Sequence, residues 1–260
     1  MAGRRVVKWF PPLSVRRTGG TVTTPPTPPT PTPPAPRAAP DPEARGLRLV
    51  LVLITLTVVS GLIDAVSYLG LGRVFTANMT GNVVVLGFAA AGAPGFSVPR
   101  TATSLCCFLV GAVAGGRVAT RFGDGGSRRR WARLTLAAEA VLVGLSAAAA
   151  FAWPGRGGTV YALIALTAFA MGVRNATVRR LGVPDLTTTV LTMTLTGLAA
   201  DSRLGNGTGH RSPRRTASVL AMLVGAFAGA WLVLHHGLGI PLLIAAAASA
   251  VLAVSASGKE

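Results

Sequence analysis

The sequence predicts an all-α polytopic membrane protein with two pseudo-repeats, each of three long transmembrane helices and one short polar segment. Half of the 260 residues are apolar and only 13% are charged, and the mean hydropathy is +0.55. The chain carries only 8 acidic residues, too few to solubilise the surface of a globular protein of this length. Long apolar runs and an internal duplication supply the remaining detail of the prediction.

Six long apolar segments are each suited to a transmembrane helix, because about 20 helical residues cross about 30 Å of hydrocarbon. They are residues 49–71, 101–120, 133–153, 159–178, 216–236 and 239–256. Two weaker segments, 75–93 and 186–200, open with hydroxyl and amide side chains. These two either cross the membrane, which gives eight spans, or enter it and return, which gives six.

The N-terminal residues 1–46 are predicted to form a disordered tail ahead of a transmembrane domain over residues 47–256. Residues 21–42 consist mainly of Pro and Thr, a composition that cannot bury a core and favours polyproline II conformation. Within the transmembrane domain, repeat one is expected over 47–153 and repeat two over 159–256.

The duplication rests on three alignments in the same order at similar offsets. Gly61, Asp64 and Ala65 fall on Gly172, Asn175 and Ala176, and Thr76 falls on Thr187. Residues 99–115 fall on 213–229 with nine identities in 17 positions. Finally, residues 137–142 fall on 247–252, which places Glu139 opposite Ser249. Together these matches indicate that one half of the domain repeats the other.

Basic residues choose between the two topologies, because cytoplasmic loops of membrane proteins are enriched in Lys and Arg. Counted from Arg37 onward, an eight-span arrangement divides them ten to ten between the two sides. A six-span arrangement leaves only Arg73, Arg100 and Arg156 outside and places 17 inside. We therefore expect six spans, two inverted repeats and both termini in the cytoplasm of a bacterium, with the protein in the plasma membrane.

Several classes of function are disfavoured by the sequence. Phosphate-binding, zinc-protease, hydrolase-elbow and C-x-x-C motifs are absent from it. The three His and two Cys form no plausible metal set, so we expect no metal, no cofactor and no enzymatic activity. The net charge of +17 comes from residues that flank apolar runs. It therefore predicts contacts with anionic lipid headgroups and no nucleic acid.

The polar segments predict a binding site for a small solute, because interrupted helices in inverted halves are typical of transporter sites. Their amide and hydroxyl groups can donate and accept hydrogen bonds, and a glycine allows close approach of backbone to a ligand. The alternative is that these groups only bond helices to one another. The predicted substrate-binding residues are Asp64, Thr76, Asn78, Thr80, Gly81, Asn82, Arg174, Asn175, Thr188 and Thr192.

Two carboxylates lie within the apolar segments, where an unpaired charge is costly. Asp64 and Glu139 are therefore candidates for proton coupling, or for ion pairs with Arg73 or Arg174.

Small residues four apart allow helices to pack closely. The predicted helix-packing residues, at equivalent places in the two halves, are Gly111, Gly115, Gly225 and Gly229. They indicate a symmetric contact between the halves or between the subunits of a homo-oligomer.

Two blocks resemble the YoaK-like family of bacterial inner-membrane proteins. The first runs from Gly61 through Asp64 to Leu69 and continues with residues 75–82, and the second contains residues 172–176 and the Thr-rich stretch 187–196. The resemblance covers residues 47–256 and implies a polytopic membrane protein without an assigned activity. We expect a small-solute permease or secondary transporter with its site between the repeats. A non-transporting membrane scaffold that binds a partner or lipid is the alternative.

Overall fold

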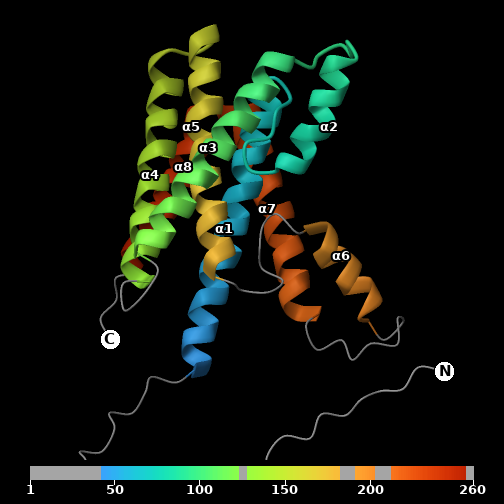
Figure 1. The fold of residues 1–260 in the computed structure, drawn as a ribbon. Coiled ribbons are helices and arrows are strands. Elements are labelled where there is room, and N and C mark those ends of the chain that lie inside the picture. Colours follow the sequence, from blue (N-terminus) through green and yellow to red (C-terminus); the bar gives the residue numbers. More distant parts are fainter. Residues whose placement is uncertain (1–41, 123–127, 182–190, 203–211, 256–260) are drawn as a thin grey trace, which may run out of the picture. The chain divides into compact units, whose positions relative to one another are not determined.

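The computed structural model describes residues 42–122, 128–181, 191–202 and 212–255, and every regular element in these ranges is a helix (Figure 1). The eight helices of this described part are α1 (Pro42–Gly70), α2 (Met79–Ala90), α3 (Val98–Phe122), α4 (Arg128–Ala152), α5 (Gly157–Leu181), α6 (Leu191–Ala200), α7 (Ser212–His236) and α8 (Gly239–Ser255). The predicted tail lies outside the described residues up to position 41. Its last residues already belong to α1, which begins at Pro42.

Five of the described helices are long and apolar enough to cross a membrane. They are α1, α3, α4, α5 and α7. The sixth predicted span, 239–256, is also helical, but α8 has only 17 residues. At 1.5 Å per residue it extends about 26 Å, slightly less than the 30 Å of a typical hydrocarbon core. The all-helical prediction is confirmed for the part of the chain that the structure describes.

The two polar segments form short helices instead of full spans. α2 has 12 residues and α6 has 10, so they extend about 18 Å and 15 Å. Neither length crosses about 30 Å of hydrocarbon. α2 packs on α3 and α6 packs on α7, and an irregular connection, residues 71–78, joins α1 to α2.

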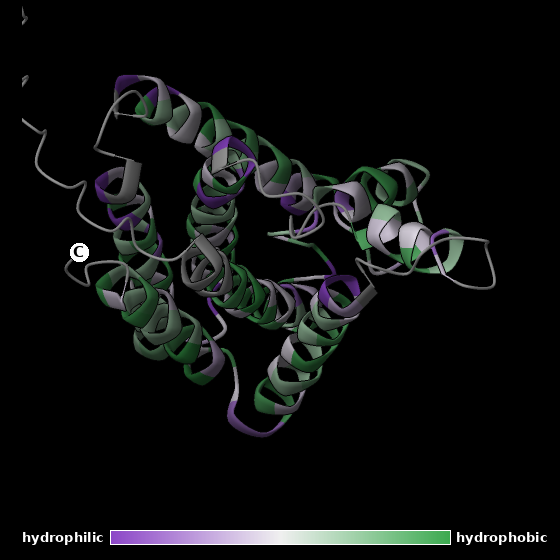
Figure 2. Cartoon of the chain, turned by 90° about the horizontal axis from the view of Figure 1, so that it is seen from below, coloured by the Kyte–Doolittle hydropathy of each residue, from purple (hydrophilic) through white to green (hydrophobic). Residues whose placement is uncertain are grey.

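The distribution of polar and apolar side chains is the reverse of that in a soluble protein. Large apolar side chains are exposed along the helices, with Phe227 at 73% and Leu223 at 63% of full exposure, whereas Glu139 and Arg174 are at 1% and 3%. Figure 2 shows hydrophobic residues along the length of most helices. This arrangement suits a lipid environment, in which ionisable groups face the interior of the bundle.

The helices pack in three main pairs, α1 with α7, α3 with α5, and α4 with α8. Glycines make two of these contacts close. Gly111 of α3 lies against the Phe169 carbonyl of α5, and Gly225 of α7 lies against the Val58 carbonyl of α1. In the same seams Gly115 faces Val173, and Gly229 faces Leu62. Each of these four glycines, the predicted helix-packing residues, thus lies against a facing helix where a Cβ would have no room.

Arginines gather at one end of the bundle. The start of α1, the end of α3, the start of α4, the end of α5 and the start of α7 lie together at the lower end in Figure 1. Terminal turns at this end carry Arg121 of α3, Arg179 and Arg180 of α5, and Arg214 of α7. This is the end that the sequence assigns to the cytoplasm.

Candidate functional site

Asp64 holds the connection between α1 and α2. The side chain of this residue is 4% exposed, and its Oδ1 accepts hydrogen bonds from the backbone N–H groups of Thr76 at 3.1 Å and Ala77 at 2.8 Å. Irregular backbone at membrane depth must find such partners within the protein. Asp64 therefore satisfies two donors of the connection directly ahead of α2.

Asn82 clamps the same connection from the other side. Its Oδ1 accepts the Phe75 N–H at 2.8 Å, and its Nδ2 donates to the Phe75 carbonyl at 2.5 Å. Nδ2 also donates to Ser104 Oγ of α3 at 3.1 Å, and the Ser104 hydroxyl donates to the Phe75 carbonyl. The Asn82 side chain is fully buried. Both polar ends of this amide are thus used inside the protein.

Gly81 makes room for an aromatic side chain. A Cβ at this position would lie 2.7 Å from the ring of Phe75, and that ring stacks on Tyr68 of α1 at a centroid distance of 4.9 Å. The small residue leaves room for the Phe75 ring, which in turn packs on Tyr68 of α1. Three of the predicted substrate-binding residues, Asp64, Gly81 and Asn82, therefore fix the connection that leads from α1 into α2.

Replacing Asn82 should destabilise the protein far more than replacing Asn78, four residues earlier. Asn82→Ala leaves the part-buried N–H of Phe75 without its side-chain partner, while the Phe75 carbonyl keeps only the bond from Ser104, so the loss should be about 1–3 kcal/mol. Asn78 is exposed and its side chain makes no capping hydrogen bond to α2, so Asn78→Ala should leave the melting temperature nearly unchanged. Thermal unfolding in detergent, followed by circular dichroism, compares the two. Equal losses would contradict the assigned clamp.

A cavity of about 200 Å³ lies between the two short helices and α7. Its lining residues are Asn78, Thr80, Gly81, Val84, Leu191, Thr192 and Met222. Four of them, Asn78, Thr80, Gly81 and Thr192, belong to the predicted substrate-binding set. The structure thus brings the beginnings of α2 and α6 together around one space, although more than 100 residues separate them in the sequence.

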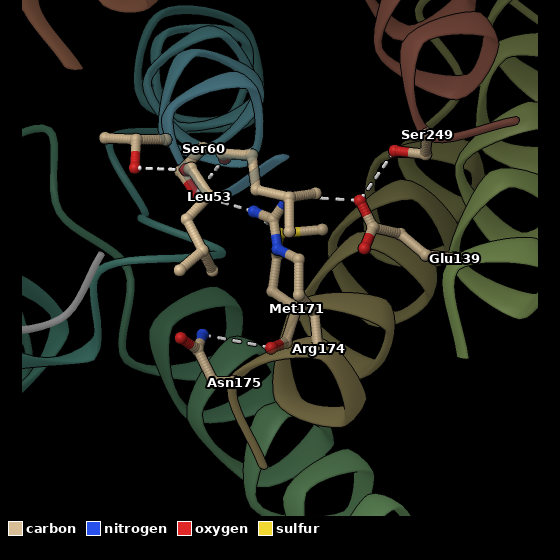
Figure 3. Close-up of polar contacts among 9 residues, drawn as sticks. Leu53, Ser60, Glu139, Met171, Arg174, Asn175 and Ser249 are labelled. Atoms are coloured by element: carbon tan, nitrogen blue, oxygen red, sulfur yellow. Dashed lines mark hydrogen bonds and ion pairs between the residues drawn. The ribbon is translucent and has the colours of Figure 1, made fainter. Parts of the chain in front are cut away.

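A second polar cluster joins α1, α4, α5 and α8 (Figure 3). Arg174 of α5 donates from Nη1 to Glu139 Oε1 of α4 at 3.0 Å and from Nη2 to Ser60 Oγ of α1 at 2.5 Å. Ser249 of α8 donates to the same Glu139 Oε1 at 2.7 Å. Both charged groups are almost completely buried. The cluster is an ion pair within the bundle, and its residues do not line the cavity.

The ion-pair alternatives are resolved differently for the two carboxylates. Glu139 pairs with Arg174, whereas the hydrogen-bonding partners of Asp64 are backbone groups. Arg73 lies elsewhere, with its guanidinium carbon 5.4 Å from the centroid of the Phe96 ring. Asn175 donates to the Met171 carbonyl one turn earlier in α5. The proton-coupling role of Asp64 and Glu139 stays a prediction.

Two predicted substrate-binding positions need a separate statement. The Thr76 side chain is fully buried and lies outside the cavity lining, while Thr188 lies outside the described residues. Among the residues that the structure does describe, no three His, Cys, Asp or Glu side chains come together as a metal site.

Sequence reasoning missed several contributors. The apolar lining residues Val84, Leu191 and Met222 carried no signal, because apolar side chains are the rule in such helices. Ser249 did carry one, because it aligns with Glu139 in the duplication. Two residues at equivalent positions can meet where the two halves face one another, and these two are hydrogen-bonded.

The apolar exposed surface, the buried charges and the five candidate spans together define a multi-pass membrane protein. The family described as "Protein of unknown function (DUF1275)" matches residues 52–255, and the chain belongs to this family. The UPF0700 transmembrane protein YoaK of Bacillus subtilis (strain 168) is 34% identical over 155 residues, which cover 58% of this chain and 65% of the relative. The match therefore spans slightly less than two thirds of that relative. The resemblance to YoaK-like proteins is confirmed, and no solved structure matches the chain.

Proposed function

We propose that this protein is a permease for a small solute, with its substrate site in the cavity between α2, α6 and α7. The observation that carries the proposal is that residues of both short helices line one cavity. Interrupted or short helices that meet within the membrane are a recurrent way of building transporter sites. The proposal assigns no enzymatic activity to the protein.

The size and chemistry of the cavity favour a small polar substrate. Its volume of about 200 Å³ is below the roughly 300–1,000 Å³ of pockets for drug-sized ligands. It corresponds to roughly six or seven water molecules at about 30 Å³ each. Asn78, Thr80 and Thr192 offer hydrogen-bonding groups, while Val84, Leu191 and Met222 offer apolar walls.

The proposal includes two inverted repeats and six crossings, with α2 and α6 entering the membrane without crossing it. Equivalent contacts in the two halves support this. Gly61 of α1 lies against the Met222 carbonyl of α7, and Gly172 of α5 lies against the Phe108 carbonyl of α3. The first pair is related to the second by the offsets of the duplication, so the α1–α7 and α5–α3 seams use equivalent residues.

Substituting a lining residue should block the cavity. Val84→Trp places a large side chain in it, whereas the neighbouring Val83, which is 60% exposed and absent from the lining, gives the control Val83→Trp. A substrate screen by thermal shift of the purified wild-type protein identifies ligands, because a ligand that binds only the folded state raises the apparent stability. We expect the shift to be lost in Val84→Trp and retained in Val83→Trp. Loss in both variants, or in neither, would contradict the proposed site.

We also propose that the protein lies in the bacterial plasma membrane with both termini in the cytoplasm, because the arginine-rich helix ends belong on that side. In a background with Cys106 and Cys107 replaced by Ala, an impermeant maleimide applied to intact cells should label Ala93→Cys and not Arg130→Cys. Lysed cells should show labelling of both. Labelling of Arg130→Cys in intact cells would reverse the orientation.

A further inference from the structure

The groups that line the cavity differ from those of a site for ions. Its polar members are one amide, Asn78, and two hydroxyls, Thr80 and Thr192, and no ionisable side chain belongs to the lining that the structure describes. A charged solute that leaves water needs a compensating charge or a dense set of hydrogen bonds. Amide and hydroxyl groups can instead both donate to and accept from an uncharged polar solute.

The beginning of α2 could still attract an anion, because the first turn of a helix exposes free N–H groups and a partial positive charge. In this protein a carboxylate of the chain itself already lies at that end. Asp64 Oδ1 is bonded to the N–H groups of Thr76 and Ala77, the two residues that precede Asn78 at the N-cap of α2. Its negative charge offsets the partial positive charge at this end of the helix and would repel a second anion.

Asp64 is held in this position from several sides. The residue is 4% exposed, so little solvent screens its charge. One turn earlier in α1, Ser60 accepts a hydrogen bond from Arg174. Between Ser60 and Asp64, Gly61 packs against the backbone of Met222, and Met222 lines the cavity. The segment 60–64 of α1 therefore lies directly behind the site.

We infer that the cavity binds a small uncharged solute with both hydrogen-bond donors and acceptors, of the polyol or amide class, and that Asp64 makes the site reject anions. The inference rests on the proposed function and specifies its substrate class. Asp64 is then a residue that determines specificity through the charge at the end of α2. It need not touch the solute.

The test is a flux assay on the full-length protein in liposomes, followed by stopped-flow light scattering. Glycerol and urea serve as uncharged probes, and nitrate and formate serve as anions, with valinomycin and potassium present to balance the charge. We expect glycerol or urea to cross severalfold faster than in empty liposomes and both anions to stay at background. The glycerol or urea flux should be lost in Val84→Trp and kept in Val83→Trp.

Other outcomes separate the two levels of the argument. Anion flux that is lost in Val84→Trp, with glycerol and urea at background, would overturn the inference and leave the permease proposal standing. Background flux for all four probes would count against the permease proposal and the inference together.

Asp64→Asn tests the assigned cause of the specificity. The amide oxygen can still accept the two backbone hydrogen bonds, but the negative charge is gone, so the nitrate flux should rise severalfold while the glycerol or urea flux is kept. Asp201→Asn removes the same charge from a side chain that is 61% exposed and should leave the nitrate flux at background. A folded Asp64→Asn protein without anion flux would overturn the role of Asp64. If gel filtration shows that this variant does not fold, the wild-type fluxes still decide the substrate class.

Discussion

Replacing Arg174 by Met should be among the most destabilising single substitutions in the protein. Its guanidinium is 3% exposed and pairs with Glu139, which is 1% exposed. Removal of one partner strands the other charge in the bundle, and such a loss is about 3–5 kcal/mol. Arg179→Met, in the same helix at an exposed position, should leave the melting temperature in detergent nearly unchanged.

The double variant Arg174→Met/Glu139→Gln should recover much of the stability lost in Arg174→Met. The wild-type pair is incompletely satisfied, because Glu139 Oε2 and Arg174 Nε have no hydrogen-bond partner among the described residues. Replacing both members of such a pair is often close to neutral. The double-mutant cycle should therefore show a coupling of more than about 1 kcal/mol, and additive losses would contradict the ion pair.

A second cycle, with Asp64→Asn in place of Glu139→Gln, compares the two carboxylates as partners of Arg174. Arg174 acts on Asp64 only through charge, since Oδ1 of Asp64 bonds to the backbone of Thr76 and Ala77. We expect Arg174 to couple more weakly to Asp64→Asn than to Glu139→Gln. A stronger coupling with Asp64 than with Glu139 would mean that Arg174 pairs with Asp64 when the protein is in the membrane.

The helices and their seams could be predicted from the sequence because they follow from short-range patterns. Apolar runs of about 20 residues locate the long helices, and glycines four apart locate close helix contacts.

The roles of the polar residues were harder to predict. Asn78 and Asn82 have the same side chain and lie one turn apart, yet Asn78 lines the cavity and Asn82 bonds to Phe75. Side chains four residues apart share a face only within a helix. Asn78 is the N-cap of α2 and has a non-helical backbone, whereas Asn82 lies within α2 and donates to Ser104 of α3. Similarly, Glu139 pairs with Arg174 because α4 packs on α5. No local pattern in the sequence encodes that tertiary contact, so the choice between Arg73 and Arg174 stayed open.

Introducing a methyl group at Gly111 or Gly225 should destabilise the protein by about 1–3 kcal/mol, because overpacking a close contact forces the backbone to shift. A Cβ at either position would overlap a carbonyl group of the facing helix, that of Phe169 or that of Val58. Neither helix can yield by rotating a side chain, since the obstructing atoms belong to the backbone. The helices α3 and α5 would have to move apart in Gly111→Ala, and α1 and α7 in Gly225→Ala.

Gly116 supplies the matched control, because it lies in α3 close to Gly111 and a Cβ there would have no neighbour within 4 Å. Gly116→Ala should be neutral or stabilising by roughly 0.5–1 kcal/mol, the usual gain when Ala replaces Gly within a helix. Melting temperatures of Gly111→Ala, Gly225→Ala and Gly116→Ala in the same detergent make the comparison. If the two seams are equivalent, Gly111→Ala and Gly225→Ala should lose similar amounts, because each glycine meets a carbonyl at the corresponding place. A large loss at one and none at the other would mean that only one seam holds the halves together, and the proposed repeat symmetry would not extend to their energetics.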